Sequence, residues 1–299
     1  MRIIVGSHNV TRPRGLITFA PVFLWLAVAV GPAPVQADDP YRNCFRDRSR
    51  AEPQTTSPGR TIVFAVPGGG RIAQRTGLLH MPESANGPVP AVIMVPGTGG
   101  VDERQDFHRA HLLKAGIATF VVDIKCGIFR RTRDRPEQDV HFPAVYAALR
   151  TLRRQPGIAA DRIAVMGWSY GAGIAVKVGL VTNTGAWLKS GEQGFAAHVA
   201  FYGGCHQASD LAGERVPVLE LVGEEDNYAS TRKCHELENE PPYLTVRRYP
   251  GAHHGFDRVD RCRKRRERSM CWHERSATKA RREVATFLTG VLKPASAAK

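Results

Sequence analysis

A serine between two glycines is the strongest chemical signal in this chain of 299 residues. The pentapeptide GWSYG at 167–171 fits the pattern G-x-S-x-G, and it lies between an expected strand at 162–166 and an expected helix at 171–181. A sharp turn from strand to helix presents the serine hydroxyl at its tip. Glycine is needed on both sides because a β-carbon would collide across so tight a turn. We therefore predict that Ser169 is a nucleophile.

A serine hydroxyl needs partners, because it is a weak nucleophile until a neighbouring base takes its proton and an acid orients that base. Where the serine stands on such a turn, the chain order is serine, acid, histidine. Asp226 follows the apolar stretch 218–222, and His254 follows the stretch 244–249. We predict Asp226 as the acid and His254 as the base. The neighbours Glu224, Glu225 and His253 remain alternatives.

The negative oxygen that forms when serine attacks a carbonyl needs hydrogen-bond donors already in place. The first expected donor is the backbone N–H of Tyr170, the residue after the nucleophile. The second is expected from the glycine-rich loop after 91–95, where we choose Thr98. Trp168, on the other side of the nucleophile, is a candidate substrate contact.

Short apolar stretches alternate with helical patterns along the chain, which predicts an α/β fold with βαβ crossovers and a mostly parallel sheet. Continuous apolar strands indicate a sheet covered by helices on both faces. The first two strands are separated by a proline and three glycines, which predicts a hairpin-like opening. The expected strands are 61–66, 72–81, 91–95, 117–122, 162–166, 198–202, 218–222 and 244–249, and the expected helices are 104–115, 140–154, 171–181 and 277–292.

Composition places the chain among globular proteins, with 42% hydrophobic and 23% charged residues. The net charge is +14, and much of it lies in residues 258–282, where eleven Lys and Arg face three acids. Such a segment could hold an anionic polymer, a membrane surface or an acidic substrate, or it could be a solvated helix and loop. The sequence lacks zinc-finger spacing, an RNP motif and interleaved aromatics, so we expect no nucleic-acid partner.

The N-terminus predicts export. Residues 1–15 are basic, 16–30 are apolar and uncharged, and small residues stand at 35 and 37. These are the three parts of a cleaved secretory signal over 1–37, with an uncleaved anchor as the alternative. After the signal we expect an extension or linker at 38–60, one α/β domain at 61–293 and a tail at 294–299. The mature protein would then be periplasmic or secreted.

Six cysteines fit that compartment, since an even number in an exported chain indicates disulfides. No two of them form a C-x-x-C pair, so zinc-ribbon and thioredoxin interpretations lack their central motif. Cys262 and Cys271 are close in sequence and could cross-link the basic segment.

Four stretches together carry a family resemblance: VPAVIMVPG at 89–97, DRIAVMGWSYG at 161–171, LVGEED at 221–226 and YPGAHHGF at 249–256. From about residue 61 to 292 the chain resembles the dienelactone hydrolase family of α/β-hydrolases. The resemblance implies the α/β-hydrolase fold, with at most eight strands, and a triad of Ser169, Asp226 and His254 without cofactor or metal. The namesake enzymes have cysteine where this chain has Ser169, so ester hydrolysis is carried over and the substrate is not.

The resemblance also implies further residues. The namesakes bind a substrate carboxylate with an arginine four residues after the catalytic histidine, and Arg258 has that position here. The arginines at 130, 131, 133 and 135 are further candidates at the mouth of the site. Exported relatives carry cysteines that correspond to Cys205 and Cys234, which would pair near the acid. Cys44 and Cys126 would be left for a third bond.

The sequence as a whole predicts an exported serine hydrolase that cleaves a carboxylic ester or lactone through an acyl-enzyme. The expected partner is a small-molecule substrate, with an anionic one as an option, and membrane contact is limited to the signal segment or the basic segment. A peptidase or acyl transferase on the same triad is the first alternative. The second is a non-catalytic protein that binds an anionic polymer on a hydrolase scaffold.

Overall fold

The computed structural model describes residues 59–68, 71–83, 86–122, 124, 141–180, 185–205, 216–237, 243–259 and 261–293. All of these lie in one compact unit, Asp38–Lys299. The expected signal, nearly all of the expected linker, the arginines at 130–135 and the whole expected tail lie outside the described residues.

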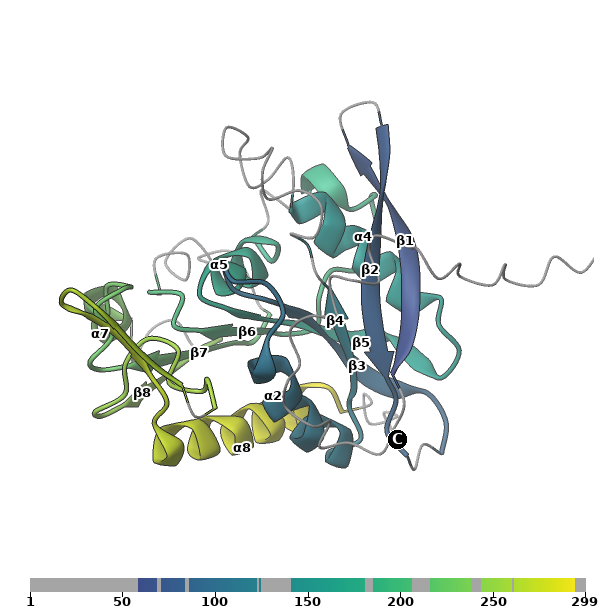
Figure 1. The fold of residues 1–299 in the computed structure, drawn as a ribbon. Coiled ribbons are helices and arrows are strands. Elements are labelled where there is room, and N and C mark those ends of the chain that lie inside the picture. Colours follow the sequence, from purple (N-terminus) through teal and green to yellow (C-terminus); the bar gives the residue numbers. More distant parts are fainter. Residues whose placement is uncertain are drawn as a thin grey trace, which may run out of the picture. The chain divides into compact units, whose positions relative to one another are not determined.

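An eight-stranded sheet forms the centre of this unit, with the strand order β1-β2-β4-β3-β5-β6-β7-β8 (Figure 1). The first two strands pair antiparallel, as do β2 and β4, and all pairs from β4 to β8 are parallel. The predicted opening hairpin and mostly parallel sheet are therefore confirmed. The strands are β1 Arg60–Gly68, β2 Arg71–His80, β3 Val89–Val95, β4 Ala118–Val122, β5 Ile158–Trp168, β6 His198–Phe201, β7 Val218–Gly223 and β8 Leu244–Tyr249.

The continuous apolar strands are buried on both faces of the sheet, and the buried apolar side chains of the described residues form three hydrophobic cores. In β3, Ala91, Ile93 and Val95 belong to the first core, while Val92 and Met94 belong to the second. Successive side chains of a strand point to opposite faces, so a strand buried on both sides must be apolar at every position. This explains why these stretches lack polar alternation.

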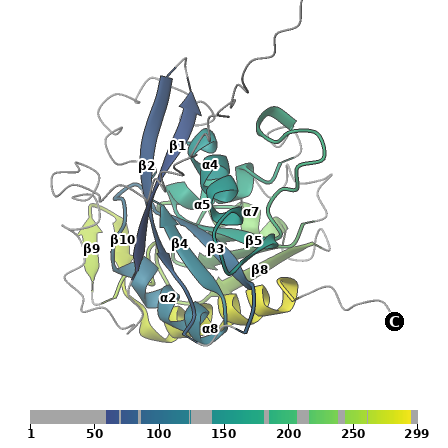
Figure 2. The ribbon, with the colours of Figure 1, turned by 90° about the vertical axis from the view of Figure 1, so that its right-hand side faces the viewer.

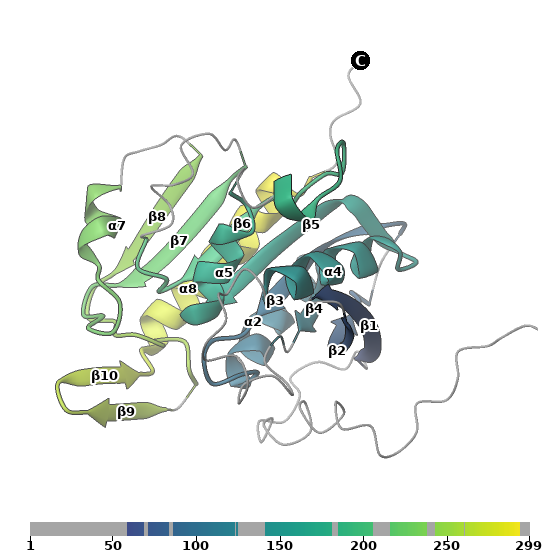
Figure 3. The ribbon, with the colours of Figure 1, turned by 90° about the horizontal axis from the view of Figure 1, so that it is seen from above.

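Helices cover both faces, as the continuous apolar strands indicated (Figures 2 and 3). The helices α4 and α5 contribute to the first core, and α2 and α8 contribute to the second. Each packs through an apolar face; in α8 this stripe is Ala277, Ala280, Val284 and Leu288, with the three-to-four-residue spacing of a half-buried helix. The bounds are α2 Glu103–Lys114, α4 Phe142–Arg153, α5 Tyr170–Lys177, α7 Arg232–Glu236 and α8 Glu274–Val291.

Local signals explain two helix starts. Asp102 caps α2, because its side chain accepts a hydrogen bond from the backbone N–H of Arg104. The side-chain oxygen of Gln105 in turn accepts a hydrogen bond from the backbone N–H of Asp102. Proline stands in the first turn of α4 at Pro143, where its missing N–H costs no hydrogen bond. None of the helices within the described ranges has the length and apolar character needed to cross a membrane.

The basic segment is the main difference from the sequence-based expectation. Instead of helix and loop alone, it contains an antiparallel hairpin, β9 Cys262–Arg265 and β10 Arg268–Cys271, before α8 begins. Consecutive charged residues do not predict a strand, because β-propensity favours β-branched and aromatic residues. The hairpin is instead closed by Cys262 and Cys271, which stand opposite each other and are disulfide-bonded.

Other differences are smaller. Strand β5 begins at Ile158, before the expected 162, and α5 ends at Lys177. The short helix α7 was not predicted.

The expected Cys205–Cys234 bond is present. It joins the loop after β6 to α7, with 5.1 Å between the Cα atoms. Cys44 and Cys126 lie outside the described residues.

A buried carboxyl in β7 predicts a pH dependence of stability. Glu220 is fully buried, and among the described residues neither of its oxygens has a hydrogen-bond partner. Burial raises the pKa of Glu220 to about 8, whereas an unfolded glutamate titrates near pH ~4.3. The folded state therefore holds the proton more tightly, and stability present at low pH is lost as pH rises from ~4.3 to about 8.

We expect Tm to fall between pH 5 and pH 9 in wild type and to fall less in Glu220→Gln. The two decreases should differ by roughly 5 °C or more. The measurement is thermal unfolding at both pH values. The control is Glu225→Gln, because Glu225 is exposed and follows the same strand. A Tm difference as large in Glu220→Gln as in wild type would contradict the prediction.

Candidate active site

Three loops at the carboxyl edge of the parallel strands bring together the residues predicted as nucleophile, base and acid. Ser169 follows β5, Asp226 follows β7 and His254 follows β8. The Nε2 atom of His254 is 2.9 Å from Oγ of Ser169. Its Nδ1 atom is 2.8 Å from Oδ2 of Asp226. Side chains that are 85 and 28 residues apart in sequence thus form one hydrogen-bonded line.

The chemistry of the partners determines how the line is oriented. An ionised carboxylate only accepts hydrogen bonds, so Nδ1 of His254 must donate to Asp226. In a neutral imidazole the other nitrogen is then an acceptor, so Nε2 accepts from the Ser169 hydroxyl. This is the direction in which a proton must move for the serine to become a nucleophile.

The turn around Ser169 is tightly compressed. The serine has φ 52° and ψ −114°, a conformation that L-residues rarely adopt. A β-carbon at Gly167 would lie 2.0 Å from the carbonyl oxygen of Gly171. One at Gly171 would lie 2.3 Å from the carbonyl oxygen of Val95. Both glycines are thus required by close backbone approach, as the sequence pattern predicted.

Asp226 is held in place by its own loop. Its Oδ1 accepts hydrogen bonds from the backbone N–H groups of Tyr228 at 2.8 Å and Ala229 at 3.0 Å. The other oxygen, Oδ2, faces His254. The side chain is buried, so a single orientation of the carboxylate is maintained.

The alternative acids and base do not join this line. Glu224 pairs with Arg248, with 2.8 Å between the charged atoms. Glu225 is exposed. His253 is partly buried, and its Nδ1 contacts the carbonyl oxygen of Glu225 rather than a side chain of this line.

The imidazole of His254 lies among aromatic rings. Tyr228 stacks against it at 5.2 Å between centroids and an angle of 27°, and Tyr202 lies at 4.6 Å. Only 4% of the residue is exposed. Aromatic packing therefore restrains the ring, in addition to its two hydrogen bonds.

A buried carboxylate beneath the site was not found from the sequence. Asp257 is fully buried. It accepts hydrogen bonds from Tyr202 Oη at 2.7 Å, from Trp168 Nε1 at 2.8 Å and from His108 Nε2 at 2.9 Å. Burial acts to raise the pKa of Asp257, but the hydrogen bond from His108 and the charge of Arg104 outweigh it, so this pKa is lowered.

This network supports the site from behind. Two of its three donors border the site: Trp168 precedes the nucleophile, and the ring of Tyr202 packs on His254. Trp168 was expected to touch substrate, but its side chain is buried in the core and bonded to Asp257. The sequence offered one signal for this buried acid: Asp257 directly follows the aromatic Phe256 and lies three residues after the predicted base, His254.

The two expected oxyanion donors lie on the segments that border the nucleophile. Tyr170 is the first residue of α5, at the end where the helix dipole is positive. Thr98 lines the same pocket as Ser169. The neighbouring Gly97 approaches so closely that a β-carbon would lie 3.1 Å from the carbonyl oxygen of Trp168.

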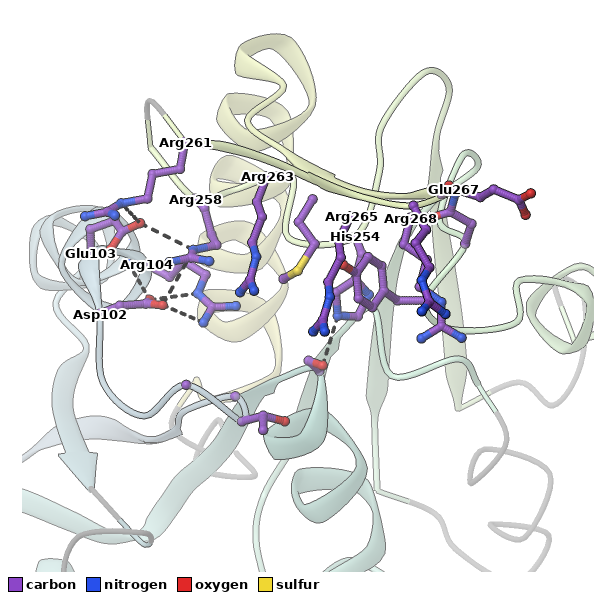
Figure 4. A pocket seen from close by; sticks show the side chains of 18 of the residues that line it. Asp102, Glu103, Arg104, His254, Arg258, Arg261, Arg263, Arg265, Glu267 and Arg268 are labelled. Atoms are coloured by element: carbon purple, nitrogen blue, oxygen red, sulfur yellow. Dashed lines mark hydrogen bonds and ion pairs between the residues drawn. The ribbon is translucent and has the colours of Figure 1, made fainter. Parts of the chain in front are cut away.

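A large and strongly basic pocket opens over Ser169 and His254, with a volume of about 1490 Å³ (Figure 4). Its lining combines the loop after β3, the start of α2, the acid loop and the hairpin β9–β10. Arg258, expected from the resemblance to bind a carboxylate, lines it; its Nε lies 3.5 Å from Glu103 and 3.7 Å from Asp102. Within the described ranges, no cluster of three His, Cys, Asp or Glu side chains could hold a metal.

Known proteins resemble this chain in sequence and in fold. The sequence profile described as "Dienelactone hydrolase family" matches residues 76–292. Among solved structures, the dienelactone hydrolase from Anabaena variabilis superposes with a TM-score of 0.59 at 19% identity, over 79% of this chain and 99% of that one. The dienelactone hydrolase-like promiscuous phosphotriesterase P91, from metagenomic libraries, gives 0.59 at 17% identity, over 78% and 99%. These superpositions show that the chain shares the α/β-hydrolase fold, as predicted.

Curated relatives are similar over a shorter region. Esterase FrsA of Klebsiella pneumoniae is 34% identical over 139 residues, covering 44% of this chain and 31% of the esterase. Esterase FrsA of Yersinia pestis is 28% identical over 148 residues, covering 48% and 33%. The chain therefore spans about a third of the length of these relatives.

The Asp257 network predicts a large stability effect at a position outside the Ser169–His254–Asp226 line. In Asp257→Asn the amide nitrogen replaces either Oδ2, which accepts from His108 and Trp168, or Oδ1, which accepts from Tyr202. Arg104 also loses a nearby opposite charge. We expect the free energy of unfolding to fall by about 3 kcal/mol, because one partner of a buried charged network is removed. Urea denaturation measures it, with exposed Asp161→Asn as the matched control. Equal free energies of unfolding in the two variants would contradict the proposed contribution of the Asp257 hydrogen bonds to stability.

Proposed function

Because the chain belongs to the dienelactone hydrolase family, we propose that it is a serine hydrolase that cleaves a carboxylic ester or lactone. The observation that carries the proposal is the hydrogen-bonded line Ser169–His254–Asp226, with 2.9 Å and 2.8 Å between the paired atoms. It lies at the floor of an open pocket, where a substrate carbonyl can reach the hydroxyl. The names of the FrsA relatives support ester hydrolysis over peptide hydrolysis.

In the proposed first step, Oγ of Ser169 attacks the ester carbonyl while Nε2 of His254 takes the hydroxyl proton. The imidazolium that forms is stabilised by the Asp226 carboxylate at Nδ1. The same proton then passes to the leaving alkoxide, and an acyl-serine remains. His254 then takes one proton from water as the remaining hydroxide adds to the acyl carbon, and it passes this proton to Oγ as the acid product leaves.

The carbonyl oxygen becomes negative during both steps and needs donors that are already oriented. We assign this role to the backbone N–H groups of Tyr170 and Thr98. Tyr170 follows the nucleophile at the positive end of α5, and Thr98 lines the pocket together with Ser169. Since both are backbone groups, side-chain substitution leaves the donors in place.

We also propose that the protein is exported and that the mature chain begins at Asp38. The basic and apolar N-terminal regions and the small residues at 35 and 37 support a cleaved signal. The two disulfides, Cys205–Cys234 and Cys262–Cys271, support an oxidising compartment.

Ser169→Ala is expected to abolish hydrolysis of 4-nitrophenyl acetate without loss of folded structure, because the hydroxyl makes no bond needed by the core. Asp226→Asn is expected to lower kcat by roughly 10³–10⁴-fold, since the amide no longer stabilises the imidazolium. Steady-state kinetics and circular dichroism measure both. Glu225→Gln is the control and should retain activity. If Glu225→Gln lost activity and Asp226→Asn kept it, the acid would be wrongly assigned.

Export is tested by expressing the full-length chain in a Gram-negative host and fractionating the cells. We expect the protein in the periplasm, with an intact mass that corresponds to a start at Asp38 and oxidised cysteines. A full-length mass in the cytoplasm, with free thiols at Cys205 and Cys234, would contradict the export proposal.

A further inference from the structure

The hairpin β9–β10 presents two chemically different faces. Opposite residues of an antiparallel pair share a face, and neighbours along a strand alternate. Arg263 stands opposite Met270, and Arg265 stands opposite Arg268. All four line the pocket over Ser169. The other face carries the Cys262–Cys271 disulfide and the pair of Lys264 and Ser269, none of which lines the pocket.

Figure 4 shows the arginine face in place. Arg263, Arg265 and Arg268 point from the hairpin into the pocket, on the side where His254 lies, while Glu267 points away from them. The basic segment therefore places guanidinium groups on one wall of the pocket, with the nucleophile on another.

Contacts hold this hairpin beside the acid loop. The side-chain amide of Asn227, the residue after Asp226, donates to the carbonyl oxygen of Glu267 and accepts from the N–H of Ser269 at 3.1 Å. The guanidinium of Arg268 lies over the ring of Tyr228, 5.3 Å from its centroid. Because Tyr228 stacks on His254, the position of the hairpin is linked directly to that of the base.

The arginines of the pocket fall into two groups by charge. The first group pairs with Asp102 and Glu103: Arg104, Arg258 and Arg261 each lie within 4 Å of at least one of these carboxylates. The second group comprises Arg263, Arg265, Arg266 and Arg268. None of the described acids forms an ion pair with any of the four, so the positive charge of the pocket wall is uncompensated on the hairpin side.

Without a bound anion, the positive charges of the hairpin arginines repel one another. Arg265 and Arg268 stand directly opposite each other, and like charges in that relation destabilise an antiparallel pair. The disulfide at the other end of the hairpin keeps the strands paired despite this repulsion. An anion between the guanidinium groups would replace repulsion by charge-assisted hydrogen bonds, and arginine can bind carboxylate, phosphate or sulfate in bidentate fashion.

We propose that the hairpin arginines select ester substrates that carry two or more anionic groups, which bind Arg263, Arg265 and Arg268 while the ester lies at Ser169. The inference rests on the proposed function and adds a substrate class to it. The shared chemistry is that of carboxylate, phosphate or sulfate, and the carboxylate serves as the probe below. Arg258 is not part of this group, since it already forms ion pairs with Asp102 and Glu103.

The test uses three 4-nitrophenyl adipates of equal acyl length. Their far ends are amides of ammonia, glycine or aspartate, so they carry no, one or two carboxylates. Wild-type protein is expected to prefer the aspartate derivative over the uncharged one in kcat/KM by roughly tenfold or more, the effect of one good charge-assisted bond. In Arg263→Gln/Arg265→Gln this ratio should fall by about tenfold.

The matched control is Lys264→Gln/Arg275→Gln. It removes the same charge from the same segment, but Lys264 is on the outer face of the hairpin and the exposed Arg275 does not line the pocket. We expect this variant to keep the wild-type ratio within about twofold. If both double variants lowered the ratio equally, the preference would come from net charge alone, as in docking to an anionic surface, and the inference would be wrong.

Two further outcomes separate the inference from the proposed function. If Ser169-dependent hydrolysis of the uncharged ester occurs without any preference for carboxylates, the function stands and the inference fails. If no ester is hydrolysed, the function fails, and calorimetric binding of tricarballylate decides the inference. We then expect Kd to weaken by about tenfold in Arg263→Gln/Arg265→Gln and not in the control. Equal Kd values in both variants would overturn it.

Discussion

The turn between β5 and α5 leaves no space for a β-carbon at either of its glycines, and the geometry of the site depends on this constraint. Gly171 lies against the end of β3 and Gly167 lies against Gly171, so Ser169 takes a backbone conformation unusual for its type. The compressed turn directs the hydroxyl away from the sheet. The partners of that hydroxyl then come from the ends of β7 and β8, which the parallel pairing brings to the same edge.

A second constraint acts below this edge. Asp257 gathers three donors in the core, and two of them belong to residues that touch the site, Trp168 next to the nucleophile and Tyr202 against His254. A buried carboxylate is costly unless its oxygens are fully bonded, so these donors cannot turn away without a large penalty. The network therefore restrains the side chains around Ser169 and His254. Above the site, Tyr228 and the hairpin β9–β10 restrain the other face of the imidazole.

Much of the fold and the central line of the site follows from local patterns. The apolar strand 91–95, the pentapeptide 167–171 and the loops with Asp226 and His254 carry their signals in adjacent residues. Two features were beyond such patterns. The partners of Asp257 come from positions 108, 168 and 202, and a set that long-range contacts bring together leaves no spacing to detect. The hairpin β9–β10 consists of charged residues with low strand propensity, and its pairing depends on the Cys262–Cys271 bond and on Asn227.

The central claim is that Ser169 is chemically activated by His254. Incubation of the oxidised, folded protein with a fluorophosphonate, followed by peptide mass mapping, tests it most directly. The serine Oγ would displace fluoride from phosphorus, and only a serine with a working base reacts readily. The account predicts one adduct on the peptide that contains Ser169, absent in Ser169→Ala. No adduct in folded, oxidised protein, or an adduct on another serine, would contradict it.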